Sequence, residues 1–250
     1  MLYTITTMRK LLCSILIIVL LLTAVCSFVA CAEEKAQGAA AETIARWQTK
    51  YTAGEFGIRS KKNPFVEFVF STGEIIRLEL YPSVAPITVN NFITYVKEGF
   101  YEGIAFHRII SSAIQWGGYE VVDDLYTEKA ATHPAIKGEF RSNGVNNTLS
   151  HVRGVISMAR LGDENSASMA RLDDMNSATS QVFICPVDAL GYDGIYAAFG
   201  RVIDEESMSV VSRIASLETH GEILYPGTTV SSDVPVTRIT ILKATLVWNK

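Results

Sequence analysis

The stretch that decides the fold reads Gly99-Phe-Tyr-Glu-Gly-Ile-Ala-Phe-His-Arg-Ile-Ile-Ser-Ser-Ala-Ile-Gln-Trp-Gly-Gly118. Its centre alternates as a half-buried strand does, which predicts that Arg108 shares a face with Phe106 and Ile110. Arginine is almost never buried without a partner or a task, because its guanidinium keeps its charge. Arg108 is therefore either a strand arginine held by an ion pair or a donor aimed at a ligand, and the fragment alone leaves both interpretations open.

The fragment resembles the cyclophilin family of peptidyl-prolyl isomerases, whose pattern runs Gly-Phe-Tyr, Phe-His-Arg-x-Ile, a short loop and Gln-Gly-Gly. Further blocks follow in the family's order: Pro82-Ser-Val-Ala-Pro-Ile-Thr-Val-Asn-Asn-Phe92, Arg153-Gly-Val-Ile-Ser-Met-Ala159, Asn176-Ser-Ala-Thr-Ser-Gln-Val-Phe-Ile184 and Asp193-Gly-Ile-Tyr-Ala-Ala-Phe-Gly-Arg-Val202. The resemblance implies a mainly β fold, a closed eight-stranded antiparallel barrel with two capping helices.

Strand patterns elsewhere in the chain agree with this fold class. Pro64 to Phe70 and Glu74 to Leu80 are apolar runs on either side of a Ser-Thr-Gly turn, which predicts a hairpin. Near the C-terminus, Ile239 and Ile241 alternate with polar neighbours as strand residues do. Many strands with few helices predict a barrel-like sheet.

Two helices are expected between the strands. Pro86 falls in the first turn of the first helix and Gly99 ends it, because proline fits a helix start and glycine a helix end. The second helix is expected from Glu205 to Leu217, with Asp204 as its N-terminal cap.

The 250-residue chain predicts one medium domain behind an N-terminal leader. We expect a leader at 1–31, a spacer with a possible short helix at 32–63, and the barrel domain at 64–250. Basic residues precede the apolar run Leu11 to Ala24, as in a signal peptide, so the chain is expected to be exported.

The end of the leader allows three interpretations of how the leader is processed. Phe28-Val-Ala-Cys31 resembles a bacterial lipobox, in which Cys31 is lipidated and anchors the protein to the outer face of the cytoplasmic membrane. Alternatively, Ala30-Cys-Ala32 is an ordinary cleavage site and the protein is secreted, or Leu11 to Ala32 remains as a membrane helix. The lipoprotein reading is preferred.

Composition excludes several other classes of site. Three of the four cysteines lie in the leader, so Cys185 has no disulfide partner within the domain and is expected to be a buried apolar side chain. The four histidines lack metal-ligand spacing, and a net charge of -4 argues against nucleic-acid binding. We expect no cofactor and no metal, a monomer, and proline-containing polypeptides and a membrane as partners.

A tandem repeat interrupts the family pattern. Ser157-Met-Ala-Arg-Leu-Gly-Asp-Glu-Asn-Ser-Ala167 is followed at once by Ser168-Met-Ala-Arg-Leu-Asp-Asp-Met-Asn-Ser-Ala178, with nine of eleven positions identical. Doubling a loop costs only about 0.6 kcal/mol of closure entropy, so the surplus is expected to form a loop that the fold tolerates. A tolerated surface insertion is favoured over a functional loop that shields the site or adds contacts.

The chemistry implied by the resemblance is rotation about the peptide bond before proline, which amide resonance slows by a barrier of about 20 kcal/mol. A donor to the prolyl nitrogen favours the twisted state, in which that nitrogen is pyramidal. By resemblance Arg108 is this donor, Phe183 forms the floor of the proline pocket and Gln181 lies beside the substrate backbone. Ala159 and Arg160 match the strand end along which the peptide lies.

Departures from the family pattern concern the pocket wall. An ungapped register puts Ala113 where the family has phenylalanine, Ile114 in place of methionine, and Trp116 in place of glutamine, unless a one-residue slip lets Gln115 serve. On the far rim, Tyr192 stands at a leucine position and Tyr196 at a position often held by histidine. All six are candidate substrate-binding residues, and the altered wall could weaken catalysis.

Two functions of different class follow. The preferred one is an exported peptidyl-prolyl cis-trans isomerase that acts on extracytoplasmic proteins. The alternative is a proline-peptide-binding module on the same barrel with weak or lost catalysis. A hydrolase is a distant third, because the sequence contains His151 and several serines but nothing that orients a Ser-His-Asp set.

Overall fold

The computed structural model describes residues 63–123, 125–160, 175–220, 223–225, 228–230 and 233–247. The predicted leader with Cys31, the predicted spacer and most of the duplicated segment lie outside the described residues. All described residues belong to one unit of the chain, Thr49–Lys250. In this part of the chain, no helix combines the length and apolarity needed to cross a membrane.

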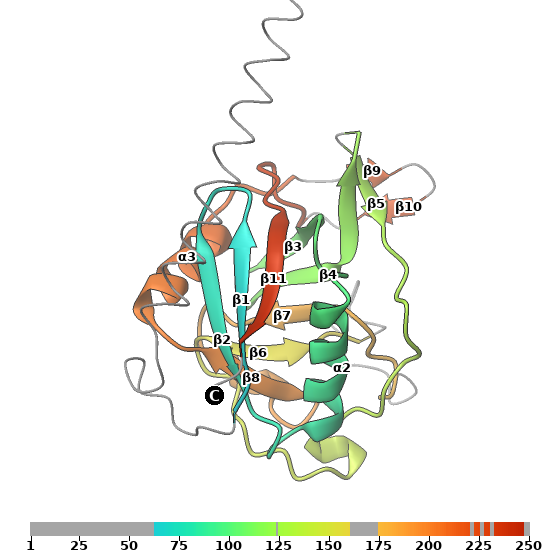
Figure 1. Cartoon of the computed structure of the whole chain (residues 1–250), viewed down its shortest axis with the longest axis vertical. Coiled ribbons are helices and arrows are strands. Elements are labelled where there is room, and N and C mark those ends of the chain that lie inside the picture. Colours follow the sequence, from blue (N-terminus) through green and yellow to red (C-terminus); the bar gives the residue numbers. More distant parts are fainter. Residues whose placement is uncertain are drawn as a thin grey trace, which may run out of the picture. The chain divides into compact units, whose positions relative to one another are not determined.

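Antiparallel strands build almost the whole unit (Figure 1). In the described part of the chain the main sheet has nine strands in the order β11-β1-β2-β8-β6-β7-β4-β3, with β5 paired to β4, and a separate hairpin joins β9 and β10. The strands are β1 (Phe65–Phe70), β2 (Ile75–Leu80), β3 (Ile104–Ile110), β4 (Ala113–Val122), β5 (Leu125–Glu128), β6 (Val155–Met158), β7 (Val182–Ile184), β8 (Ala198–Val202), β9 (Ile223–Tyr225), β10 (Thr228–Val230) and β11 (Ile241–Val247).

The two ends of the main sheet, β3 and β11, approach each other around the core. Ala105 forms an isolated bridge with Thr240, and the backbone nitrogen of Gly103 donates to the oxygen of Ile241 at 2.9 Å. The described end strands are therefore linked by single contacts and not by a continuous ladder of backbone hydrogen bonds. The predicted mainly β fold with two helices is confirmed, whereas the closed eight-stranded barrel that the resemblance implied is here a curled nine-stranded sheet in the described part of the chain.

Aromatic rings fill the core that the curled sheet encloses. Phe68 and Trp116 come from β1 and β4, are at most 1% exposed, and meet edge to face with ring centroids 5.7 Å apart. Tyr101 packs edge on against Phe68 at 5.8 Å. Edge-to-face pairs add to the apolar burial of such rings, so this cluster fixes β4, which carries part of the candidate site on its other face.

Helix α2 (Pro86–Lys97) covers one opening of the sheet and follows the prediction closely. Pro86 is in its first turn, and Gly99 follows its end with φ of +69°, a left-handed conformation that favours glycine. Its Ala85 cap has no acceptor side chain, and Glu139 takes that role, accepting from the backbone nitrogens of Ile87 at 3.1 Å and Thr88 at 2.7 Å.

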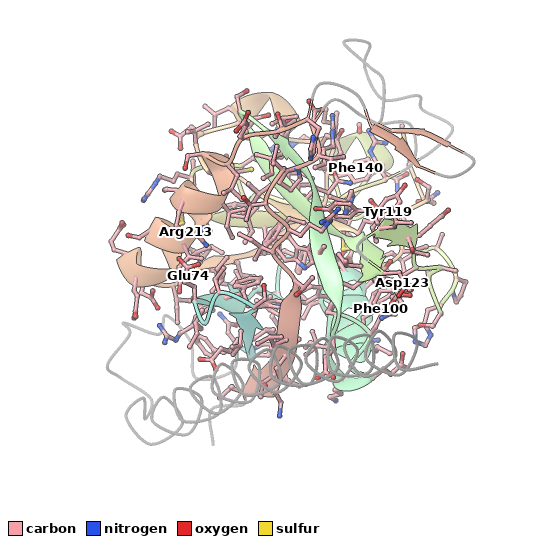
Figure 2. The ribbon with its side chains drawn as sticks, turned by 90° about the horizontal axis from the view of Figure 1, so that it is seen from above. Glu74, Phe100, Tyr119, Asp123, Phe140 and Arg213 are labelled. Carbon is pink, nitrogen blue, oxygen red and sulfur yellow. The ribbon has the colours of Figure 1, made fainter. Side chains whose placement is uncertain are left out.

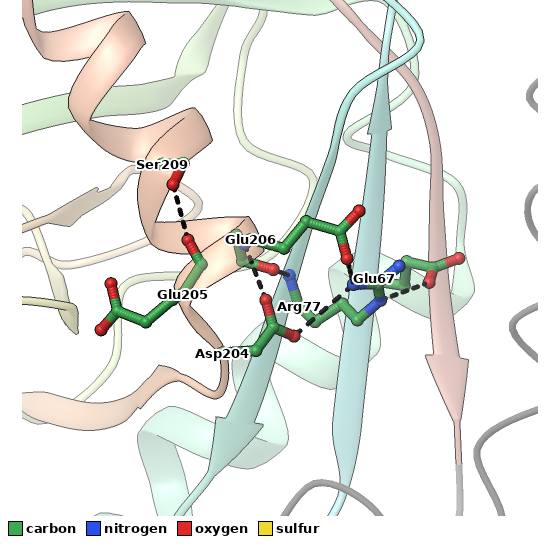
Figure 3. Close-up of polar contacts among 7 residues, drawn as sticks. Glu67, Arg77, Asp204, Glu205, Glu206 and Ser209 are labelled. Carbon is green, nitrogen blue, oxygen red and sulfur yellow. Dashed lines mark hydrogen bonds and ion pairs between the residues drawn. The ribbon is translucent and has the colours of Figure 1, made fainter.

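Helix α3 (Glu205–Ala215) was also predicted, although it ends two residues before Leu217. Asp204 caps it by accepting from the backbone nitrogen of Ser207 at 2.7 Å. The buried Arg77 of β2 ties the helix start to the sheet, since its Nη1 contacts Asp204 and its Nε contacts Glu67 of β1 (Figure 3). At the other end of the helix, Arg213 contacts Glu74.

Polar side chains lie all around this unit, as the stick view shows, and Arg213 and Glu74 lie next to each other at its edge (Figure 2). The pair links α3 to the turn between β1 and β2. Nε and Nη2 of Arg213 each donate to a different carboxylate oxygen of Glu74, so the pair is bidentate although the side chains are 40% and 30% exposed.

One expectation about β3 was wrong. Alternation placed Phe106 and Arg108 on one face, but Phe106 pairs with Trp116 while Arg108 pairs with the adjacent Gln115, so an irregularity at His107 sets two β3 residues against one of β4. Phe106 is therefore in the core, whereas Arg108 lies with Gln115 on the opposite face.

Candidate active site

Three adjacent strands present the central candidate residues in one row. Arg108 of β3 is paired with Gln115 of β4, which is paired on its other side with Phe183 of β7. Nη1 of Arg108 donates to Oε1 of Gln115 at 3.5 Å, a long hydrogen bond. The Arg108 side chain is 21% exposed, so its remaining donors are within reach of a ligand.

Gln181 extends this polar row. Nε2 of Gln115 donates to Oε1 of Gln181 at 2.8 Å, and His107 is hydrogen-bonded to the Gln181 side chain. Burial lowers the pKa of His107 to about 4, so a neutral imidazole adds no second charge beside Arg108 at pH 7. Gly118 makes the approach possible, because a Cβ there would lie 2.5 Å from Nε2 of Gln181.

Asp233 is an acidic partner of Arg108 that sequence reasoning missed. Its Oδ2 lies 3.5 Å from Nε of Arg108, and its backbone oxygen accepts from the nitrogen of Ile109 at 2.7 Å. The two residues are 125 positions apart in the chain, and no motif surrounds Asp233. The salt-bridge and the ligand-donor interpretations of Arg108 are thus compatible, because one ion pair leaves most of a guanidinium's five donors unused.

The side chain of Phe183 belongs to a second cluster, which is separate from the main core. Its buried members are Ala113, Ala159, Phe183 and Cys185, and partly buried apolar residues including Tyr192 and Tyr196 pack against them. The Phe183 ring meets the rings of Tyr192 and Tyr196 edge to face, at 5.5 Å and 5.4 Å. The hydroxyl groups of Tyr192 and Ser112 are 2.6 Å apart, which ties the far rim to the β3–β4 turn.

His151 lies next to the three rings of this aromatic cluster. Its ring is nearly parallel to that of Phe183, at 16° and 6.2 Å, and its Nδ1 lies 2.8 Å from Oδ1 of Asp193. Its Nε2 lies 3.1 Å from Oγ of Ser157. The structure therefore brings together a Ser-His-Asp set that could not be recognised from local motifs, because Asp193 and Ser157 come from separate blocks.

Arg160 and Ala159 lie at the end of β6. The guanidinium carbon of Arg160 is 5.1 Å from the ring centroids of both Phe140 and Tyr196, an arrangement that attracts a cation to each ring face. The backbone nitrogen of Ala159 donates to the oxygen of Gln181 at 3.0 Å. That N–H is consequently engaged within the protein.

Two of the residues predicted for the wall of the proline pocket face the main core instead. Ile114 and Trp116 are at most 1% exposed and belong to the main core, whereas Ala113 and Gln115 alternate with them and face the site. The structure thus brings Gln115, not Trp116, to Arg108. Cys185 is buried as expected, and burial raises the pKa of its thiol to about 12.

The structure thus combines a curled antiparallel sheet and two helices with an arginine beside an aromatic cluster on the face away from the core. The family model described as "Cyclophilin type peptidyl-prolyl cis-trans isomerase/CLD" matches residues 65–246. The chain belongs to this family of enzymes.

Curated relatives agree with that membership. A peptidyl-prolyl cis-trans isomerase of Acinetobacter baylyi is 41% identical over 163 residues, which cover 63% of this chain and 74% of that protein. Peptidyl-prolyl cis-trans isomerase B of Escherichia coli is 34% identical over 163 residues, covering 62% of this chain and 85% of that protein.

Solved structures support the fold. A cyclophilin-type peptidyl-prolyl cis-trans isomerase of Cryptosporidium parvum has a TM-score of 0.53 at 20% identity, and the match covers 75% of this chain and 99% of that one. Its crystal structure in the presence of the dipeptide Ala-Pro has a TM-score of 0.52 at 21% identity, with coverages of 73% and 98%.

Proposed function

We propose that this protein catalyses cis-trans rotation of X-Pro bonds in exported polypeptides, with Arg108 as the donor to the prolyl nitrogen. The observation that carries the proposal is the row Arg108, Gln115 and Phe183 on three paired strands. It sets a permanent cation and an apolar ring on one face of the sheet, which are the two groups that a proline in rotation needs.

Arg108 would act through charge and geometry. In the twisted state the lone pair of the prolyl nitrogen is no longer delocalised into the carbonyl group and is localised on nitrogen, so a hydrogen bond to it is stronger than in either planar state. Gln115 and Asp233 hold the guanidinium from two sides, at 3.5 Å each, and limit its motion before substrate arrives. Arginine does not titrate in the physiological range, so this donor stays charged.

The neighbouring residues would bind the peptide. Phe183 provides the apolar surface for the proline ring, with Ala113, Tyr192 and Tyr196 beside it. Gln181 lies where it can orient the substrate backbone, and the carbonyl of Ala159 is the main-chain group that we assign to the peptide. No bond is made or broken in the rotation, so the proposal needs neither a nucleophile nor an acid-base pair.

The assay that tests this function measures isomerisation of a short proline-containing peptide by the full chain in mild detergent. We expect a rate enhancement that falls by about a hundredfold or more in Arg108→Ala, the size usual for losing one transition-state donor. Arg153→Ala is the matched control, because that arginine is 44% exposed and pairs with Glu205 away from this row. An Arg108→Ala variant that folds and retains full activity would refute the role of Arg108.

A second candidate function is a proline-peptide-binding module with little catalysis. The departure that favours it is Ala113, a small side chain where the family has phenylalanine. Peptide binding by the folded wild type without any rate enhancement would support this candidate and refute the isomerase.

Export and membrane attachment through Cys31 remain part of the proposal. They rest on the basic and apolar pattern of the leader and on the small Ala30 before Cys31. Incorporation of labelled fatty acid into the wild type and its loss in Cys31→Ser would support lipidation. Unlabelled protein in the culture medium would indicate ordinary cleavage, and a full-length product in the membrane would indicate an uncleaved helix.

A further inference from the structure

The candidate site has a buried polar group behind it for which the isomerase chemistry assigns no role. His151 is 1% exposed, and its ring is nearly parallel to that of Phe183. It is steeply inclined to two tyrosine rings, with centroids 5.9 Å from Tyr192 and 6.4 Å from Tyr196. A single imidazole is thus a neighbour of the rings of Phe183, Tyr192 and Tyr196.

The partners of His151 define its tautomer. Asp193 has a carboxylate, which only accepts, so the proton must lie on Nδ1 of His151 and donate to Oδ1. Nε2 then carries a lone pair and accepts from the hydroxyl of Ser157 at 3.1 Å. Oδ1 of Asp193 also accepts from the backbone nitrogen of His151 at 2.7 Å, so one oxygen orients both the backbone and the ring.

Charge and burial agree with this assignment. Burial lowers the pKa of His151, opposed by Asp193, so the imidazole is neutral at pH 7. Burial alone would raise the pKa of Asp193, but hydrogen bonds from His151 and Ser150 together lower it, which keeps the carboxylate ionised. The other rings around His151 belong to Tyr192 and Tyr196.

The same set is not a hydrolytic triad. Ser157 is 0% exposed and lies within β6, paired with Phe183 on one side and Ala198 on the other. A nucleophile must reach a carbonyl carbon, and this hydroxyl is enclosed by the sheet and the imidazole. The geometry therefore serves to hold the His151 ring.

We infer that His151, fixed by Asp193 and Ser157, is a positioning residue that sets the rings of Phe183, Tyr192 and Tyr196 for binding proline. The inference rests on the proposed function for its effect on peptide binding. Asp193 directly follows Tyr192 and is bonded to His151 in the segment that precedes β6, so the one carboxylate links the far rim of the site to the imidazole beside Phe183.

Nuclear magnetic resonance of the full chain in detergent micelles tests the inference with three readouts. Long-range proton–nitrogen spectra report the His151 tautomer, aromatic signals report the Tyr192 and Tyr196 rings, and titration with an Ala-Pro peptide separates affinity from the exchange rate of the bound peptide. The variant is Asp193→Asn. The matched control is Glu98→Gln, which alters the exposed carboxylate that pairs with His133 at 2.8 Å.

We expect an Nδ1-protonated His151 in the wild type. In Asp193→Asn the amide oxygen still accepts but carries no charge, so we expect His151 to be held less firmly and peptide affinity to fall about fivefold, the factor for about 1 kcal/mol. We expect the bound exchange rate to stay within twofold of the wild type and no change in Glu98→Gln. If Asp193→Asn does not fold, Ser157→Ala replaces it in the same measurements, and we again expect peptide affinity to fall. An Nε2-protonated wild type, or unchanged affinity in a folded variant, would overturn the inference.

Failure of the proposed function has a different signature. If the wild type neither binds nor isomerises the peptide, the isomerase is refuted while the tautomer and ring signals still decide the role of His151. Broadened or shifted tyrosine signals in Asp193→Asn would then support positioning, and unchanged ones would refute it.

Discussion

Glu67 is predicted to make the stability of this protein depend on pH near neutrality. The residue lies in β1, its side chain is 1% exposed, and Nε of Arg77 is 3.3 Å from its Oε2. Its other oxygen, Oε1, is buried without a hydrogen-bond partner. Burial raises the pKa of Glu67 from 4.5 to about 7, because the desolvation outweighs the attraction of Arg77.

The size of the effect follows from linkage. A carboxyl whose folded pKa is raised stabilises the fold fully below its unfolded pKa, and that contribution is lost as pH rises through the folded value. At 1.36 kcal/mol per pKa unit, a shift from 4.5 to about 7 corresponds to about 3 kcal/mol in total. Most of this change, roughly 2.5 kcal/mol, falls between about pH 5 and pH 8.

The assay is chemical denaturation of wild type and Glu67→Gln at pH 5 and pH 8. The glutamine still offers an oxygen to Arg77 but does not titrate, so the variant should gain roughly 2.5 kcal/mol relative to the wild type between the two pH values. Glu206→Gln is the control, because Glu206 contacts the same arginine at 3.1 Å but is 74% exposed (Figure 3). Parallel pH profiles for wild type and Glu67→Gln would refute the reasoning.

Three further predictions concern stability, each measured by chemical denaturation. Glu139→Gln should lose about 1 kcal/mol, since one of the two acceptors at the start of α2 is lost, and no loss would contradict the capping role. Gly200→Ala should lose about 2 kcal/mol, because its Cβ would lie 2.5 Å from a backbone oxygen, whereas Gly191→Ala, with open space, should be neutral. Deleting residues 161–171, one repeat length, should change stability by less than about 1 kcal/mol and preserve isomerase activity; loss of folding would show that the repeat is structural.

The fold was predictable where local signals are strong. Pro86, Gly99 and Asp204 mark helix ends through backbone geometry and capping, and the structure has helices at those places. The irregularity at His107 was not predictable, because Phe106 to Ile110 reads as regular alternation and only pairing with β4 reveals the extra residue. Periodicity describes a strand, whereas register depends on two strands.

The residues of the candidate site were likewise only partly predictable from the sequence. Arg108 and Phe183 could be named from short motifs, but the partners that orient them could not. Asp233 and His151 reach the site from distant segments and carry no pattern of their own. The sequence alone could not decide whether Gln115 or Trp116 takes the place of the family's glutamine, because that depends on which face of β4 each side chain occupies.

The altered wall shows why a residue-by-residue comparison understates this site. Ala113 removes a ring from the β4 side, yet it packs in one cluster with Phe183 and Tyr192. The Tyr192 hydroxyl is bonded to Ser112, the residue directly before Ala113, so the tyrosine is held across the small side chain. An aromatic surface beside Phe183 can therefore come from the segment that carries Tyr192 instead of from β4. On this argument Ala113→Phe should crowd Tyr192 rather than improve proline binding, and a peptide affinity that rises in this variant would show that the wall is simply incomplete.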